Sequence, residues 1–330
     1  MIEKGLWNDT IAEGAQVSNI FLEISSTLTL PVAIMGLAGN IVSCFVFIAN
    51  RRNDVVSFQY LTYLSVVDSA YIITFLIWEE GDILFTFDMS DITCKLLVAA
   101  MRLFRTMDGL LLMTLSLERL TVIRFPIWAS INVTKFRRSL LIVLVTVAAM
   151  LITFPVIAIT GKRTIDKCDF IFSASMSACN TIFIVNLLKA FKIFIPGITI
   201  CISNIIIVHS AFNSWRTFAR GEDPGRKRNK GRLLVMTVTI SSLYVALLFP
   251  RELFWTTRSL LLRCLAIDIW NSESIFIQIH PLLHIFSLSN YAINFIIYSV
   301  VLDYFRQTII DFILCRPLRQ TTKMRNDIRN

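Results

Sequence analysis

Two charged side chains, Glu118 and Arg119, stand together inside a long apolar stretch, and Cys94 lies 25 residues before the arginine. A helix rises about 1.5 Å per residue, so this separation covers about 38 Å, close to the thickness of a bilayer with its interfaces. We therefore expect Cys94 and Arg119 at opposite mouths of one membrane-crossing helix. Charges inside a membrane are costly and usually functional, so the pattern suggests a helix that transmits a signal across the membrane.

The composition indicates an integral membrane protein. The chain has 330 residues, of which 55% are hydrophobic, and a spanning helix needs about 20 apolar residues. The alternation typical of membrane barrel strands is weak. The predicted fold class is an all-α membrane protein, a seven-transmembrane helix bundle. The predicted spans are 27–50, 58–79, 92–123, 139–160, 184–212, 232–262 and 275–301.

Lysine and arginine residues near the span ends set the orientation. They gather in the connections that follow the first, third and fifth spans and in the tail, whereas acidic residues dominate the other side. The basic side is the cytosolic side, so the N-terminus is expected outside and the C-terminus inside. The formal charge of +9 is then explained by loops that face anionic lipid, not by nucleic acid. We expect an extracellular segment (1–26), a seven-transmembrane domain (27–301) and a cytosolic helix 8 with a tail (302–330).

Two modification sites fit this topology. Asn8-Asp9-Thr10 is a glycosylation sequon in the part of the chain expected outside the cell. Cys315 follows the last amphipathic stretch, where palmitoylation and a free thiol are the two alternatives.

Together, the seven spans, the outside N-terminus, Cys94 and the Glu118-Arg119 pair resemble the rhodopsin-like (class A) G-protein-coupled receptors. The resemblance covers about residues 27–315 and implies a short cytosolic eighth helix. It rests on further positions that match the family's motifs in order, namely Asn40, Asp68, Pro196, Pro250, the segment Asn294–Tyr298 and the pair Phe305-Arg306.

Several positions depart from the family's motifs. Phe295 stands where the seventh-helix motif has proline, Leu248 where the sixth helix has tryptophan, and Leu120 where the third helix has tyrosine. Val145 and Asn204 replace a fourth-helix tryptophan and a fifth-helix tyrosine. These departures concern how the receptor switches, and they are typical of a divergent, invertebrate-type orphan receptor.

The resemblance implies a disulfide from Cys94 to the second extracellular loop. Cys168 in that loop is the favoured partner, and Cys179 is the rival. Disulfides persist in the oxidising environment expected on that side.

The resemblance also implies a switch for G-protein coupling built from Glu118, Arg119, Asn294 and Tyr298. Arg119 would pair with Glu118 at rest and be released on activation; the alternative is a static ion pair at a helix end. The basic residues Lys227, Arg228 and Lys230 would contact the G protein, or serve as ordinary anchors of topology.

A layer of polar side chains is expected at one depth in the membrane: Asn40, Asp68, Asp108, Asn290 and Asn294. Two carboxylates at one depth repel, so either one keeps a proton or a cation lies between them. The resemblance names sodium as that cation, held by Asp68, Asp108, Asn290 and Asn294. No other cofactor is expected.

A ligand site is expected between the outer halves of the helices, since ligands bind between bundle helices. Arg102 and Arg105 share one face of the third span; the alternative is that Glu252 or Glu79 neutralises one of them, with no role in ligand binding. Met101 stands where amine receptors carry an aspartate. The predicted ligand-binding residues are Glu79, Glu80, Met101, Arg102, Arg105, Arg251, Glu252, Trp255, His280 and His284.

The expected function is that of a plasma-membrane receptor that transmits an extracellular signal to a heterotrimeric G protein. The leading ligand is a short neuropeptide with a basic residue and a carboxylate or amide end, because the first extracellular loop is acidic. The alternative of the same fold is a chemosensory receptor for a small molecule. A transporter or channel is a third, less favoured function, since the two halves of the sequence show no duplication. No enzymatic activity is expected.

Overall fold

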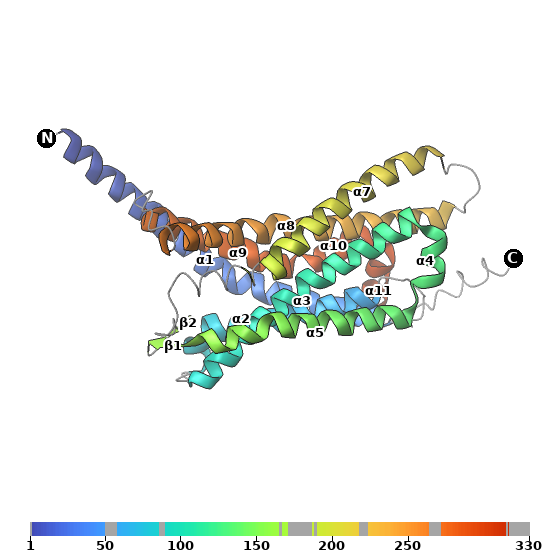
Figure 1. Ribbon diagram of the computed structural model, residues 1–330, viewed down its shortest axis with the longest axis horizontal. Helices are drawn as coiled ribbons and strands as arrows, with labels where there is room; N and C mark the ends of the chain where they lie inside the picture. Colours follow the sequence, from blue (N-terminus) through green and yellow to red (C-terminus); the bar gives the residue numbers. More distant parts are fainter. Residues whose placement is uncertain are drawn as a thin grey trace.

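The computed structural model describes the backbone of residues 2–49, 58–85, 90–164, 167–170, 187, 190–217, 224–263, 272–314 and 316. Helices arranged lengthwise form the body of the molecule, with a two-stranded hairpin at one end (Figure 1). The elements are α1 (Ile2–Ala49), α2 (Phe58–Phe85), α3 (Asp91–Arg124), α4 (Pro126–Asn132), α5 (Lys135–Ile159), β1 (Thr160–Thr164), β2 (Lys167–Phe170), η2 (Ala190–Phe194), α7 (Ile195–Thr217), α8 (Pro224–Arg263), α9 (Ser272–Ala292), α10 (Asn294–Val301) and α11 (Asp303–Ile313).

Apolar helices long enough to cross a bilayer make up most of the described chain. Five single helices of the described chain qualify as crossings. A bent pair of helices, Pro281–Ala292 with Asn294–Val301, provides a sixth; the axes of its two helices differ by 46°. These segments overlap six of the seven predicted spans. The five single helices that pass by length and composition are Glu23–Ala49, Phe58–Trp78, Lys135–Pro155, Phe191–Phe212 and Gly231–Thr257.

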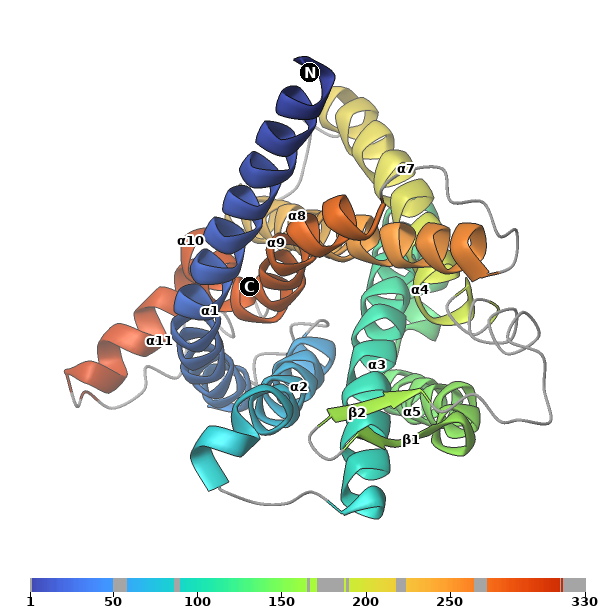
Figure 2. The same ribbon diagram turned by 90° about the vertical axis from the view of Figure 1, so that its left-hand side faces the viewer.

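The seventh crossing is α3. It has 34 residues, about 50 Å of helix, and it contacts α2, α5, α7 and α8. Its sequence is less apolar than that of the other spans because it carries charged residues, of which Asp108, Glu118 and Arg119 are buried. Figure 2, which looks along the bundle, shows α3 inclined between its neighbours. The predicted seven-transmembrane helix bundle is therefore confirmed, and α3, with its buried charged residues, lies among the other helices.

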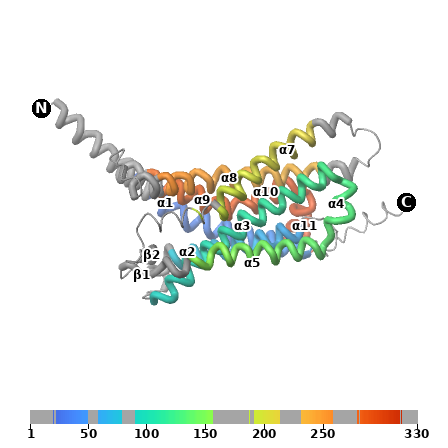
Figure 3. The backbone as a smooth tube through the Cα atoms, in the orientation of Figure 1, coloured from blue at the N-terminus to red at the C-terminus, as the bar shows by residue number. Residues whose placement is uncertain are grey.

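The two ends of the bundle carry different small elements. β1 and β2 pair antiparallel, with Lys162 opposite Cys168, and the hairpin contacts α3. The short helix α4 follows α3 at the other end of the bundle, the end at which α11 also lies (Figure 3). We call the end with the hairpin the Cys94 end and the end with α4 the Arg119 end. The hairpin, which lies between α5 and η2, was not predicted.

The outer surface of the bundle is apolar. Leu151, Phe154, Ile205 and Val300 are between 66% and 73% exposed within the molecule. Lipid tails are as apolar as leucine, so such side chains are favourable on a surface that faces acyl chains. The outer surface is therefore built for a membrane.

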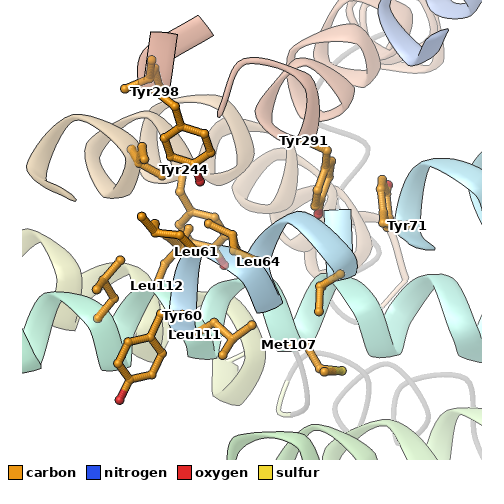
Figure 4. Packing of buried hydrophobic residues seen from close by; sticks show 14 of the residues in the cluster. Tyr60, Leu61, Leu64, Tyr71, Met107, Leu111, Leu112, Tyr244, Tyr291 and Tyr298 are labelled. Atoms are coloured by element: carbon orange, nitrogen blue, oxygen red, sulfur yellow. The ribbon is translucent and has the colours of Figure 1, made fainter. Parts of the chain in front are cut away.

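The interior is rich in tyrosine. Tyr60, Tyr71, Tyr244, Tyr291 and Tyr298 are each at most 4% exposed. Figure 4 shows them among leucines of α2 and α3. Tyrosine combines a large apolar ring with one hydroxyl group, so this core brings polar atoms into the middle of the bundle.

Small residues allow α1 to approach α9 and α10 closely. A Cβ atom added at Gly36 would lie 2.8 Å from Cβ of Ala292, and one at Gly39 would lie 2.7 Å from Cβ of Phe295. Real Cβ atoms do not approach so closely, and small residues at such positions let membrane helices meet. Phe295, where a proline was expected from the family's motif, thus packs directly on a glycine.

The bend between α9 and α10 forms although Phe295 is not proline. The side chain of Asn40 donates from Nδ2 to the carbonyl oxygen of Tyr291 over 2.8 Å. In an unbroken α-helix that carbonyl would accept from the amide of Phe295. A side chain that enters the hydrogen-bond ladder is a known cause of helix kinks, so Asn40 provides a physical reason for the 46° bend.

Helix α11 occupies the position predicted for the eighth helix. Leu302 separates it from α10, and Phe305 and Thr308 are its buried residues. The ring of Phe305 lies 5.6 Å from that of Phe47 and 5.7 Å from that of Tyr298, centroid to centroid. These aromatic contacts fix α11 to α1 and α10.

Candidate functional site

Helix α3 presents charged groups at three levels, starting with Arg105 nearest the Cys94 end. Nη1 of Arg105 donates to Oε1 of Glu252 over 2.8 Å, and Nη2 donates to Tyr71 OH over 3.0 Å and to Ser287 Oγ over 2.9 Å. The guanidinium also lies 5.6 Å from the centre of the Tyr71 ring. Because these partners belong to α2, α8 and α9, Arg105 joins four helices.

Arg251 enlarges this first level. Its Nη1 donates to the same Ser287 Oγ over 3.2 Å. The rings of Tyr71 and Tyr291 stack beside the group with centroids 3.9 Å apart (Figure 4). Within the described part of the chain, two guanidinium groups and one carboxylate, Glu252, therefore meet here. The pairing of Arg105 with Glu252, one of the alternatives left open by the sequence, is present.

The second level holds two buried carboxyl groups, Asp68 and Asp108, which interact electrostatically. Asn294 donates from Nδ2 to Oδ2 of Asp68 over 2.7 Å, and Asn290 donates to Oδ2 of Asp108 over 3.1 Å. The other oxygen, Oδ1, of each aspartate has no hydrogen-bond partner within the described part of the chain. The four residues predicted to lie together do so.

Unpartnered carboxylate oxygens fit a small cation, because sodium takes oxygen ligands, and they fit a shared proton equally well. Among the described residues, no three histidine, cysteine or acidic side chains are arranged to hold a metal ion. A cation here would therefore depend on Asp68, Asp108 and neutral oxygens.

The third level lies at the Arg119 end. Glu118 is nearer to Arg138 of α5 than to Arg119: Oε2 lies 3.3 Å from Arg138 Nε, whereas Oε1 lies 3.9 Å from Arg119 Nη2. Arg138 is only 4% exposed and also donates from Nη2 to the carbonyl of Val133 over 3.1 Å. The predicted Glu118–Arg119 pair is thus present but loose, and Glu118 is shared with a second arginine.

Two further contacts hold α8 at this end. Arg232 of α8 forms an ion pair with Asp303 of α11. Asn204 of α7, where the family's motif has tyrosine, donates to Ser241 of α8 over 2.9 Å and to Ser242 over 3.1 Å. Tyr298, the last predicted switch residue, is fully buried.

The other predicted ligand-binding residues are partly placed. Met101, Arg102 and Trp255 are half-buried, and the ring of His284 lies 5.2 Å from that of Phe75. The side chains of Glu79, Glu80 and His280 lie outside the described residues.

Cys94 is fully buried and disulfide-bonded. Its predicted partner Cys168 lies in β2, which contacts α3, but the Cys168 side chain is outside the described part, as is Cys179. Pairing with Cys168 stays a prediction.

The remaining predicted sites cannot be placed by their side chains. Asn8 lies within α1, and Lys227, Arg228 and Lys230 lie within α8, with side chains outside the described residues. Cys315 is outside them entirely.

Sequence reasoning missed several residues of these three levels. Tyr71, Ser287 and Tyr291 were not singled out, and Arg138 was read only as one of the basic residues that set topology. Asp303 was not considered at all. Arg138 is a basic residue next to an apolar span, but the sequence does not distinguish it from its neighbour Arg137.

The family described as 7 transmembrane receptor (rhodopsin family) matches residues 39–298. The chain belongs to this family. The match covers well over half of the receptor and runs from the Gly39 contact of α1 to Tyr298 in α10. A comparison with curated protein sequences returned no match.

Membership makes the protein a multi-pass membrane receptor that signals through a G protein in response to a ligand. The predicted resemblance and the predicted receptor function are therefore confirmed. The family is a receptor family, not a family of enzymes.

Proposed function

We propose that the receptor binds a short neuropeptide at the Cys94 end and activates a heterotrimeric G protein at the Arg119 end. The observation that carries the proposal is the position of Arg105. It hydrogen-bonds Tyr71, Glu252 and Ser287, so a ligand that changes its partners alters how α2, α8 and α9 pack on α3.

The proposed orientation places the Cys94 end outside the cell. Disulfides persist in oxidising compartments, and Cys94 is disulfide-bonded. At the other end the sequence is basic around α4, between α7 and α8, and after α11, as expected for the cytosolic side. Residues 1–26 would then be extracellular, and 302–330 would follow the membrane domain 27–301 inside the cell.

The proposed switch is the loose pair of Glu118 and Arg119. Nε and Nη2 of Arg119 have no hydrogen-bond partner within the described residues, so this side chain can turn toward a G-protein helix when α8 moves. Motion of α8 would break the Arg232–Asp303 ion pair and the Asn204–Ser241 hydrogen bond. These contacts are the resting-state restraints in this scheme.

The proposal is tested by G-protein activation in cells that express the wild type or Arg119→Ala, using a library of short peptides with free-acid and amidated ends. A peptide response that disappears in Arg119→Ala at equal surface expression supports the proposal. Arg124→Ala, at the last turn of α3, is the matched control and keeps the response.

A small-molecule sensor of the same fold is the second candidate, since a compact polar site around Arg105 suits a small ligand too. Activation by small organic compounds, with no peptide active at any end group, would replace the neuropeptide proposal by this one.

A further inference from the structure

Several hydrogen-bond donors at the first level of α3 find no acceptor among the side chains and backbone groups that the structure describes. Within the described residues, Nε of Arg105 and Nε of Arg251 are buried and unpartnered, and so is the hydroxyl of Tyr291. The hydroxyl of Tyr291 also lies close enough to Arg105 to interact with it. A buried N–H or O–H group without an acceptor destabilises a structure, because it loses its hydrogen bonds to water and gains none in return. The group therefore lacks acceptor atoms.

The charges point the same way. Arg105 and Arg251 are close enough to repel each other, and Glu252 is the carboxylate that hydrogen-bonds within the group. Asp108, the next acid along α3, accepts a hydrogen bond from Asn290 at the second level. Arg105 and Arg251 also share a single neutral acceptor, Ser287 Oγ.

Arg251 and Trp255 lie on the part of α8 toward the Cys94 end, with Trp255 one turn beyond Arg251, and both are half-buried. A ligand that entered the bundle from that end, as the proposed function requires, would meet Arg251 before Arg105.

We propose that Arg105, Arg251 and Tyr291 bind a carboxylate group of the ligand. A carboxylate offers two oxygens with several acceptor positions, and a guanidinium presents its N–H groups as a planar fork that matches them. The carboxylate supplies acceptors to the three unpartnered donors, and its charge offsets the repulsion between the two arginines. Phosphate and sulfate groups share this acceptor chemistry and are distinguished by the test.

This inference rests on the proposed function for the place of ligand entry, and it narrows the ligand class. The expected peptide ligand could end in a carboxylate or in an amide, and this inference selects the carboxylate. An amide brings two N–H donors of its own, so it leaves part of the donor excess unmatched.

The test is a binding measurement on the purified full-length receptor in lipid nanodiscs. The unfolding temperature is recorded with N-acetylphenylalanine, with its amide, and with phenyl phosphate. The first two probes differ only in the carboxylate. The variant is Arg251→Gln, and the matched control is Lys95→Gln, which removes a half-buried positive charge of α3 at the same end. Arg105 is not replaced, because it joins four helices.

We expect N-acetylphenylalanine to raise the unfolding temperature of the wild type and of Lys95→Gln, and its amide to leave both unchanged. Arg251→Gln should weaken carboxylate binding by about tenfold to a hundredfold, the loss of a hydrogen bond to a charged group. A stronger response to phenyl phosphate than to the carboxylate overturns the choice of ligand. Equal responses to acid and amide, an unchanged response in Arg251→Gln, or no response to any probe overturn the site.

Failure of this test is separable from failure of the proposed function, because no G protein takes part in it. A receptor that signals to peptides through Arg119 but binds no carboxylate keeps its proposed function and loses this site. A receptor that binds the carboxylate at Arg251 without peptide signalling keeps the site and loses the peptide ligand.

Discussion

Replacing Arg138 by glutamine is expected to lower basal signalling. Arg138 lies 3.3 Å from Glu118 and competes with Arg119, which lies 3.9 Å from the same carboxylate. Without the competing charge, Arg119 can close to a hydrogen-bonding distance of Glu118. The resting state would become more stable relative to the active state, in which Arg119 is released.

The size of the effect follows from these distances. With an effective dielectric constant of about 20, a pair of unit charges attracts by about 4 kcal/mol at the present 3.9 Å and by about 6 kcal/mol at about 2.9 Å. The gain is about 1.5 kcal/mol, which corresponds to about a tenfold smaller active fraction. Arg138→Gln should therefore reduce basal G-protein activation by about tenfold.

The assay is GTP-analogue binding in membranes that hold equal amounts of surface receptor. Arg137→Gln is the matched control: Arg137 is the adjacent residue of the same charge, is exposed, and contacts Asn132 rather than Glu118. Unchanged or raised basal activity in Arg138→Gln, with Arg137→Gln equal to wild type, would refute the reasoning. It would mean that Arg138 stabilises the resting state.

Three further predictions concern the fold and the second level. In Gly109→Ala the new Cβ collides with the Tyr244 hydroxyl oxygen; the variant should lose about 1–3 kcal/mol of stability, and Tyr244→Phe should restore the unfolding temperature. Asp108→Asn should abolish any stabilisation by sodium over choline chloride; no sodium response in the wild type favours a shared proton, and a response that persists in the variant means that sodium binds elsewhere. Cys168→Ser should free the Cys94 thiol and lower surface expression, whereas Cys179→Ser should do neither; mass spectrometry under non-reducing conditions identifies the pair.

Helix positions could be predicted from the sequence because lipid imposes long apolar runs. Six spans are visible by length and composition, and α3 could be found despite its charges because Cys94 and Arg119 lie a bilayer apart. The clustering of Asp68 with Asn294 and of Asp108 with Asn290 was also predictable, since residues at one depth on inward faces meet.

Contacts that depend on helix rotation could not be predicted. Nothing in the spacing shows that Arg138 turns toward Glu118 while Arg137 turns away, although the two are neighbours. The hydrogen-bonded group around Arg105, at the first level, likewise depends on the tilt of α3 against α8 and α9. Phe295 replaces the proline of the family's seventh-helix motif, yet the bend is present because Gly39 makes room for the ring and Asn40 holds the Tyr291 carbonyl.

The hydrogen-bonded group around Arg105 has a consequence for the biogenesis of the receptor. Tyr71 precedes Arg105 by 34 residues, but Glu252 and Ser287 follow it by 147 and 182. At synthesis rates of about 5–20 residues per second, Glu252 leaves the ribosome about 7–30 seconds after Arg105. During that interval Arg105 is in or near the bilayer, and of its three hydrogen-bond partners Tyr71, Glu252 and Ser287, Tyr71 alone has been synthesised. Chains that stop before α8 would therefore keep a poorly compensated charge in the membrane, a feature by which cellular quality control can tell an unfinished receptor from a complete one.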